Sequence, residues 1–195
     1  MTKFACVRKL LLAIMVVVGL VAARNACAFT AANADTAFAA YNDAFYFTQG
    51  TNGYFRATTV GGKTWFWERA EQMEMLLDVY ERSSNTVCLT MFSNVFNGFL
   101  TDHGRIWEQN EFNDDIMWMV IACARGYQHS GNPVLRDVAR TNFDMCYARA
   151  WFTNLGGGLW WKTDNHSKNA CVNGPVAIAA HLLYQISGDA GYVWH

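Results

Sequence analysis

Two consecutive aspartates, Asp114 and Asp115, precede the apolar run 116–122 and are the residues of this chain best suited to chemistry. Adjacent carboxylates repel each other, so the presence of two of them at the N-terminus of a helix calls for an explanation. In one interpretation they serve the helix, accepting hydrogen bonds from free backbone N–H groups near the positive end of its dipole. In the other they act as the nucleophile and the general acid of a glycosidase, because repulsion in a partly dehydrated cleft keeps one of them protonated.

A glycine-rich segment carries a second set of candidates. Three glycines at 156–158 permit backbone conformations closed to other residues and a close approach of a ligand. Trp160 and Trp161 follow them and would suit the apolar face of a pyranose. The alternative is a turn whose tryptophans pack inside a helical hairpin. A phosphate-binding loop is excluded, because Trp161 precedes Lys162 where that motif requires glycine.

Polar residues near expected helix starts are the remaining candidates. Asn169 stands where it would cap a helix, and it would also be placed to meet a glycan. His166, in the loop before it, is either a ligand contact or a solvated side chain. Glu68 and Glu71 either reach a site or belong to the solvated face of an amphipathic helix.

The elements that position these residues are predicted to be helices, because apolar side chains recur with the period of a helix face. The expected helices span residues 31–47, 65–82, 86–100, 114–129, 134–151 and 170–186, and a further one begins at 190. Loops are expected at 49–63, 103–111 and 153–168, with 159–163 the best local strand candidate. The fold class is therefore all-α, as stacked helical hairpins or a toroid, with an irregular bundle as the alternative.

The first 28 residues have the layout of a secretory signal peptide. Lys3, Arg8 and Lys9 form a basic start, an apolar run covers 10–23, and small residues precede Phe29. The apolar run is too short for a comfortable membrane span, which needs about 20 residues. The chain is thus expected to be secreted, extracellular or periplasmic, as a single domain over 29–195 with no stable membrane association after cleavage.

The charge of the remaining chain limits its partners. Residues 29–195 carry 11 basic and 16 acidic side chains, a net charge of −5. Binding of nucleic acid depends on Lys and Arg neutralising phosphates, so a nucleic-acid partner is excluded. The aromatic content of 15 % is compatible with sugar binding.

Four cysteines remain after the expected cleavage, namely Cys88, Cys123, Cys146 and Cys171. They could form two disulfides in any of three connectivities. Each lies in an apolar, helix-like context, which favours free cysteines acting as small core residues. The spacing of histidines and cysteines indicates no metal site, and no cofactor is expected.

Together these segments resemble glycoside hydrolase family 76, the endo-α-1,6-mannanases. The resemblance rests on residues 66–71 (Phe-Trp-Glu-Arg-Ala-Glu), 113–118 (Asn-Asp-Asp-Ile-Met-Trp), 156–161 (Gly-Gly-Gly-Leu-Trp-Trp), 168–170 (Lys-Asn-Ala) and 173–175 (Asn-Gly-Pro). Their order and spacing fit the family over most of the chain after the signal segment.

The resemblance implies an (α/α)6 toroid and a retaining mechanism acting on α-mannan. It implies that Asp114 is the nucleophile and Asp115 the general acid/base. The side chains implied to line or support the glycan cleft are Asn113, Trp160, Trp161 and Asn169. A complete toroid has six helical hairpins and this chain supplies about three, so the chain is expected to be a fragment or a truncated product.

Two other functions stay open from the sequence alone. One is a non-catalytic mannan-binding protein, and the other is an exported helical scaffold in which Asp114 and Asp115 only cap a helix. A transglycosylase that joins mannan to another polymer would use the same chemistry as the hydrolase.

Overall fold

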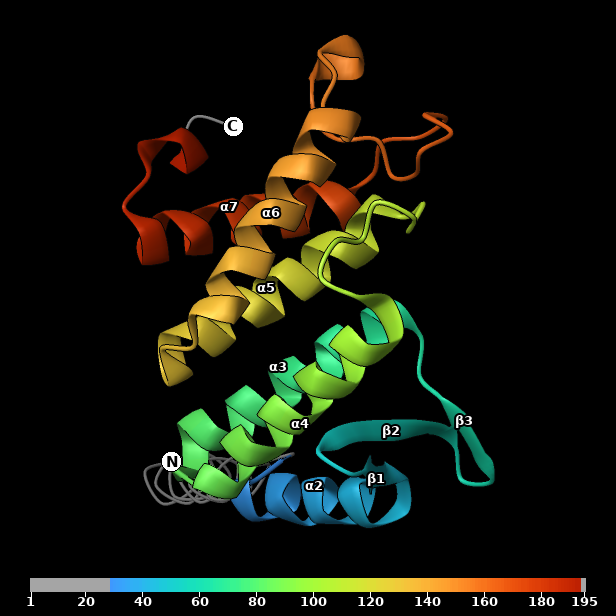
Figure 1. Cartoon of the computed structure of the whole chain (residues 1–195), viewed down its shortest axis with the longest axis vertical. Coiled ribbons are helices and arrows are strands. Elements are labelled where there is room, and N and C mark those ends of the chain that lie inside the picture. The colour runs from blue at the N-terminus through green and yellow to red at the C-terminus, as the bar shows by residue number, and fades with distance from the viewer. Residues whose placement is uncertain (1–28, 194–195) are drawn as a thin grey trace, which may run out of the picture. The chain divides into compact units, whose positions relative to one another are not determined.

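The computed structural model describes residues 29–193 (Figure 1). The predicted signal peptide lies outside these residues. Over the described range the chain contains six helices, α2 to α7, three short strands and two 3-10 turns. In that range no helix is both long and apolar enough to cross a membrane.

The chain divides into two compact units, residues 1–44 and 45–195. The described part of the first unit is residues 29–44, which hold all but the last residue of α2 (Ala31–Phe45). This helix was expected over 31–47. Thr30 starts this helix, because the Asn33 amide donates to Thr30 Oγ1 at 3.2 Å and the Thr30 amide donates to Asn33 Oδ1 at 3.0 Å. These reciprocal hydrogen bonds satisfy two backbone donors at the helix start.

The second unit is built from helical hairpins. It contains α3 (Phe66–Ser83), α4 (Thr86–His103), α5 (Asn113–Ser130), α6 (Pro133–Ala150) and α7 (Ala170–Ser187). These bounds confirm the expected helices to within about three residues at each end. Asparagine side chains cap three of the helix starts, accepting from the backbone amide two or three residues further on: Asn85 for α4, Asn132 for α6 and Asn169 for α7.

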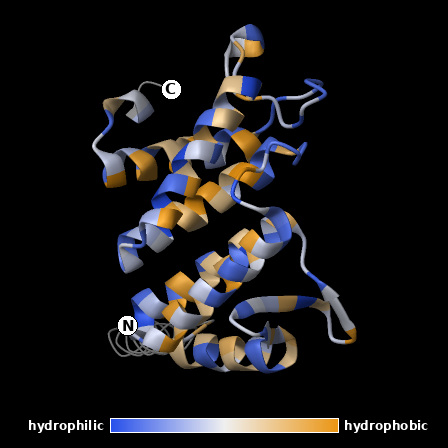
Figure 2. Cartoon of the chain, in the orientation of Figure 1, coloured by the Kyte–Doolittle hydropathy of each residue, from blue (hydrophilic) through white to orange (hydrophobic). Residues whose placement is uncertain are grey.

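Helix α5 is the centre of this unit. It packs against α3, α6 and α7, and ten of its eighteen residues are buried. Such burial on several faces requires an apolar sequence, which appears as frequent hydrophobic residues along α5 (Figure 2). The N-termini of α3, α5 and α7 lie toward the same side of the unit, which brings three helix starts together there (Figure 1).

A small antiparallel sheet occupies part of the segment expected to be a loop at 49–63. Its strands are β1 (Tyr46–Gln49), β2 (Asn52–Thr58) and β3 (Gly61–Lys63), in the order β1-β2-β3. Strand β2 packs on α4, where Gly98 lets the backbone of Gly53 approach closely. The loop prediction was wrong because the strands are short, and three of the glycines that suggest a loop lie within them, Gly53 in β2 and Gly61 and Gly62 in β3.

Three further expectations need correction. Residues 159–163 form no strand but only two isolated bridges, Phe112 with Lys162 and Trp151 with Leu159. The predicted loop 153–168 contains a 3-10 turn, η1 (Asn154–Gly156). The expected seventh helix is a 3-10 turn over its described part, η2 (Ala190–Val193).

The contact between α5 and α4 yields a test of this packing. A Cβ added to Gly126 would lie 2.2 Å from Cζ of the buried Phe92 ring. We expect Gly126→Ala to lower the free energy of unfolding by about 1–3 kcal/mol, the usual cost of overpacking, despite the better helix propensity of alanine. Urea denaturation measures the change.

The matched control is Gly126→Ala in a protein that lacks the Phe92 ring. In a Phe92→Leu background, Gly126→Ala should cost clearly less or become stabilising, so the two changes should couple. Equal costs in both backgrounds would contradict the proposed contact.

Candidate active site

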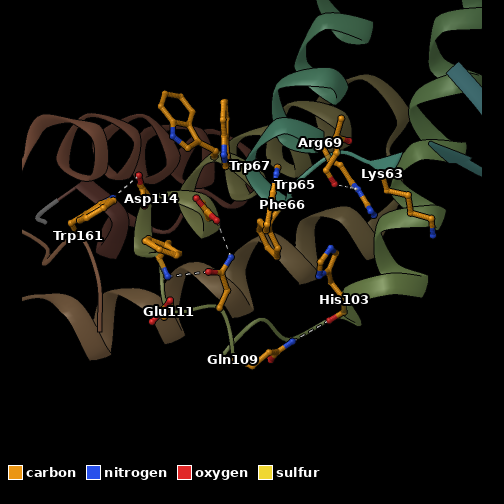
Figure 3. A pocket seen from close by; sticks show the side chains of 15 residues that line it. Lys63, Trp65, Phe66, Trp67, Arg69, His103, Gln109, Glu111, Asp114 and Trp161 are labelled. Atoms are coloured by element: carbon orange, nitrogen blue, oxygen red, sulfur yellow. Dashed lines mark hydrogen bonds between the residues drawn. The ribbon is translucent and has the colours of Figure 1, made fainter. Parts of the chain in front are cut away.

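A cleft of about 940 Å³ opens at the N-termini of α3 and α5 (Figure 3). This volume lies in the upper part of the usual range for ligand sites. The cleft is lined by residues of β3, α3 and α5, the last residue of α4, and the loops beside them: Lys63, Thr64, Trp65, Phe66, Trp67, Arg69, His103, Gln109, Asn110, Glu111, Phe112, Asp114, Asp115, Trp118 and Trp161. Both aspartates singled out from the sequence are therefore in one hollow.

Asp114 is held by two donors from outside its own helix. Trp161 Nε1 donates to Asp114 Oδ2 at 2.8 Å, and Cys171 Sγ lies 3.3 Å from the same oxygen (Figure 3 shows the Trp161 bond). The other oxygen, Oδ1, is buried and has no hydrogen-bond partner among the described residues. The carboxylate is thus fixed through Oδ2, while Oδ1 is a buried acceptor without a partner in the described chain.

Asp115 has different surroundings. Its side chain accepts a hydrogen bond from Asn110, whose Nδ2 lies 3.3 Å from Asp115 Oδ2. Burial, together with the negative charge of Asp114, raises the pKa of Asp115 to about 6, although the Asn110 bond opposes the rise. A carboxyl group with such a pKa can hold a proton near neutral pH and give it up in a reaction.

These contacts bear on the helix-capping interpretation. Phe112 occupies the N-cap position of α5 and makes no side-chain capping bond. Within residues 29–193, the hydrogen bonds accepted by Asp114 and Asp115 come from Trp161, Cys171 and Asn110 rather than from amides of α5. The pair is therefore built into a network of loop and α7 side chains, which capping alone would not require.

Asn113 holds the tryptophan loop against the start of α5. Its buried side-chain Nδ2 donates to the Trp160 carbonyl at 2.8 Å, and its backbone amide donates to the Trp161 carbonyl at 2.9 Å. Its Oδ1 accepts a bond from Arg149 Nε at 2.8 Å. Asn113 thus supports the cleft without lining it. Both polar groups of its side chain form hydrogen bonds within the protein.

Asn173 holds the same loop against α7. Its Oδ1 accepts from the Leu159 amide at 2.8 Å and its Nδ2 donates to the Leu159 carbonyl at 3.2 Å. Gly158, with φ of +101°, passes so close that an added Cβ would lie 2.5 Å from Asn173 Oδ1. The contacts of Gly158 and Leu159 with Asn173, in the first turn of α7, therefore fix the backbone that leads to Trp161.

The structure places the predicted binding residues in different roles. Trp161 lines the cleft, whereas Trp160 is 8 % exposed, does not line it and lies beneath Lys168 and beside Phe152. For Trp160 the packing alternative describes its position. Asn169 caps α7 by accepting from the Val172 amide at 3.3 Å, and its Oδ1 lies 2.9 Å from Cys171 Sγ.

Other cleft residues were not assigned to the site from the sequence. Trp65 and Trp67 are 74 % and 45 % exposed and both line the cleft. Trp67 lies in the first turn of α3, before the buried residues Ala70, Met73, Leu76 and Leu77 of that helix. Glu68 caps its own helix by accepting from the Trp65 amide at 2.6 Å.

The other end of the cleft carries a charged group that ties three elements together. Asp102 of α4 pairs with Lys63 of β3 at 3.0 Å and with Arg69 of α3 at 2.8 Å. Although burial acts against it, these two hydrogen-bonded cations hold the pKa of Asp102 below its usual range. Burial and the same cations lower the pKa of the neighbouring His103.

The cysteines and possible metal ligands complete the inventory of the described residues. All four cysteines are free, as expected, and Cys88, Cys123 and Cys146 are buried. Cys171 is exposed, so its expected core position was wrong; the apolar run of α7 begins only after its first turn. Within residues 29–193 no group of three His, Cys, Asp or Glu side chains is placed to hold a metal ion.

The close packing of Gly158 against Asn173 predicts that alanine costs more stability at Gly158 than at Gly156. Gly156 and Gly158 both have positive φ, +85° and +101°, so alanine strains either position by roughly 1–3 kcal/mol. Only at Gly158 would the new methyl meet Asn173. We expect Gly158→Ala to cost about 1–3 kcal/mol more unfolding free energy than Gly156→Ala in urea titrations. Equal losses would show that the contact with Asn173 does not constrain the loop.

The raised pKa of Asp115 predicts a pH-dependent effect on stability. Below its unfolded pKa near 3.8 the group is protonated in both states, so Asp115→Asn should change stability little. Between about pH 3.8 and 6 the unfolded chain ionises this carboxyl group while the folded protein still holds the proton, so the stability of the parent falls and the variant becomes the more stable protein. Above about pH 6 the group is ionised in both states, and the difference stays level. After solvent screening the gain should be on the order of 1 kcal/mol at pH 8.

Thermal unfolding of both proteins between pH 3.5 and 8 measures this gain. Because Glu74, with a pKa of about 7, is present in both, its contribution cancels in the difference. A difference that stays constant across this range would contradict the assigned pKa.

Comparisons with known proteins extend this description. The family model of glycosyl hydrolase family 76 matches residues 26–194. The α-1,6-mannanase GH76A from Salegentibacter sp. HEL1_6 is 31 % identical with a TM-score of 0.72, over 82 % of this chain and 46 % of that one. Inactive variants of that enzyme, with two consecutive aspartates replaced by asparagine or alanine, were solved with α-1,6-mannotriose and α-1,6-mannotetrose.

A more distant structure shares the fold alone. A Listeria innocua protein, 22 % identical, has a TM-score of 0.69 over 82 % of this chain and 48 % of its own. The comparison with curated proteins gives no match.

The chain thus spans about half the length of the solved structures it matches. Its hairpins α3–α4 and α5–α6, followed by α7, have the arrangement of the (α/α)6 toroid found in those neighbours. The extent of the family-model match and the fold agree with the resemblance seen in the sequence, and this chain belongs to glycosyl hydrolase family 76.

Proposed function

We propose that this protein is a secreted retaining glycoside hydrolase that cleaves internal α-1,6-mannosidic bonds of mannan. The observation that carries the proposal is the pair Asp114 and Asp115, which share one cleft but have different partners. The bound mannooligosaccharides of the Salegentibacter variants support α-mannan as the substrate. The signal-like first 28 residues support secretion.

The surroundings of Asp114 suit a nucleophile. A nucleophilic carboxylate must be ionised and correctly oriented, and hydrogen bonds to the charged form favour both. Trp161 supplies such a bond to Oδ2 and leaves Oδ1 without a partner. In the proposed first step the Asp114 carboxylate attacks the anomeric carbon, forming a mannosyl–enzyme ester as the glycosidic bond breaks.

The surroundings of Asp115 suit the general acid and base. Its raised pKa, about 6, keeps a fraction of the group protonated near neutral pH. In the first step it gives its proton to the leaving glycosidic oxygen. In the second step the resulting carboxylate takes a proton from water, which attacks the ester and releases the sugar with its original configuration. No cofactor takes part in this sequence.

The remaining cleft side chains suit a sugar chain. Trp65 and Trp67 present exposed aromatic surface, against which the apolar face of a pyranose can pack. Asn110, Gln109 and Glu111 provide polar groups for its hydroxyls. A cleft of about 940 Å³ can accommodate several linked sugars, as a cut within a polymer requires.

The two catalytic roles make a stereochemical prediction. Asp114→Asn and Asp115→Asn should each reduce release of reducing ends from α-1,6-mannan by at least about 1,000-fold, because each step needs its own group. With azide, Asp115→Ala should yield an α-mannosyl azide, formed from the covalent intermediate. Asp114→Ala should yield a β-mannosyl azide, because azide then attacks the substrate directly. Proton NMR of the products distinguishes these anomers.

The control is Glu68→Gln, which alters a nearby carboxylate that caps α3 and should leave turnover within a few-fold of the parent. Full activity of both asparagine variants would refute the assigned roles. Mannan binding without any product from the parent chain would favour the non-catalytic alternative. New linkages in place of reducing ends would indicate a transglycosylase.

A further inference from the structure

The first turn of α7 places the exposed Cys171 next to Asp114, the proposed nucleophile. Cys171 Sγ lies 3.3 Å from Asp114 Oδ2, although 57 residues separate the two in the chain. The Trp161 indole N–H approaches the same oxygen at 2.8 Å. Two donors from two different segments therefore meet one carboxylate oxygen, and Oδ1 is left buried without a partner in the described chain.

The thiol has a second neighbour, Asn169 Oδ1, at 2.9 Å. That amide oxygen already accepts the Val172 backbone N–H at 3.3 Å, which also fixes the orientation of the Asn169 amide. A single S–H can serve either oxygen, and an ionised carboxylate is the stronger acceptor. Asn169 thus places Cys171, and the charge of Asp114 draws the thiol proton toward the carboxylate.

Resting on the proposed function, we infer that Cys171 is a positioning residue for Asp114: its thiol and the Trp161 indole hold Oδ2 and so fix the orientation of the nucleophilic carboxylate. The role requires that the thiol stays protonated in the working enzyme. Burial and the neighbouring Asp114 raise the pKa of Cys171 to about 11, which keeps the S–H donor present at neutral pH.

This pairing is reciprocal and can be tested without turnover. If Asp114 accepts the thiol proton, then removing its charge must make Cys171 easier to ionise. We expect Asp114→Asn in the full chain to increase the rate of iodoacetamide alkylation at Cys171 by about tenfold at pH 8, since one pKa unit changes the thiolate fraction tenfold. Peptide mass spectrometry locates the label, because the other described cysteines are buried.

Asp115→Asn is the matched control, because it removes a neighbouring charge that has no bond to the thiol. Its alkylation rate should remain within about twofold of the parent. Equal rates in all three proteins, or equal acceleration in both variants, would overturn the inferred pairing. This result would leave the roles of the aspartates in hydrolysis untouched.

Turnover supplies the second arm of the test. Cys171→Ala should lower kcat on α-1,6-mannan by about 3- to 10-fold, the equivalent of one hydrogen bond, with KM little changed. Cys171→Ser keeps a donor and should recover most of kcat. An unchanged kcat in Cys171→Ala, or equal losses in both variants, would contradict a positioning role, whereas activity in Asp114→Asn would instead refute the proposed function.

Discussion

The site depends on one constraint, the double attachment of the loop 158–161 to two helix starts. Asn113 at the start of α5 binds the carbonyl groups of Trp160 and Trp161, and Asn173 in α7 binds both backbone polar groups of Leu159. Buried backbone groups must find such partners, so the loop has little freedom to move without losing hydrogen bonds. Its fixed position places the Trp161 indole on Asp114.

The same constraint makes neighbouring aspartates unequal. Asp114 receives donors from the attached loop and from α7, whereas Asp115 turns to Asn110 and loses hydration. Burial without compensating charge raises the pKa of a carboxyl group, and the adjacent negative charge adds to the rise. Two identical residues at successive helix positions thus acquire different chemistry from the segments packed around them.

Much of this arrangement was predictable from the sequence, for specific reasons. The periodic apolar residues gave the helices, Asn169 was expected to cap one of them, and the charged pair before an apolar run indicated the catalytic candidates. The antiparallel sheet was missed, since three short strands rich in turn residues resemble a loop. The exposed Trp65 and Trp67 were missed because spacing along a helix does not show where the neighbouring elements stop covering it.

The contacts between distant segments were beyond sequence reasoning. Trp160 and Trp161 are adjacent and chemically identical, yet one packs beneath Lys168 and the other lines the cleft. Asn113 hydrogen-bonds the backbone carbonyl groups of both, a contact between distant segments that residue type and spacing do not reveal. Likewise, the apolar context of Cys171 favoured a core position, whereas its place in the first turn of α7 brings it to the surface beside Asp114.

The central claim is that the paired aspartates divide the roles of proton donor and nucleophile. Its most direct test is a carboxyl ¹³C NMR titration of the parent chain, Asp114→Asn and Asp115→Asn. A carboxyl signal that titrates near pH 6 should be present in the parent, persist in Asp114→Asn and vanish in Asp115→Asn. Glu74, with a pKa of about 7, should titrate in all three. A signal near pH 6 that vanishes in Asp114→Asn and persists in Asp115→Asn would contradict the account.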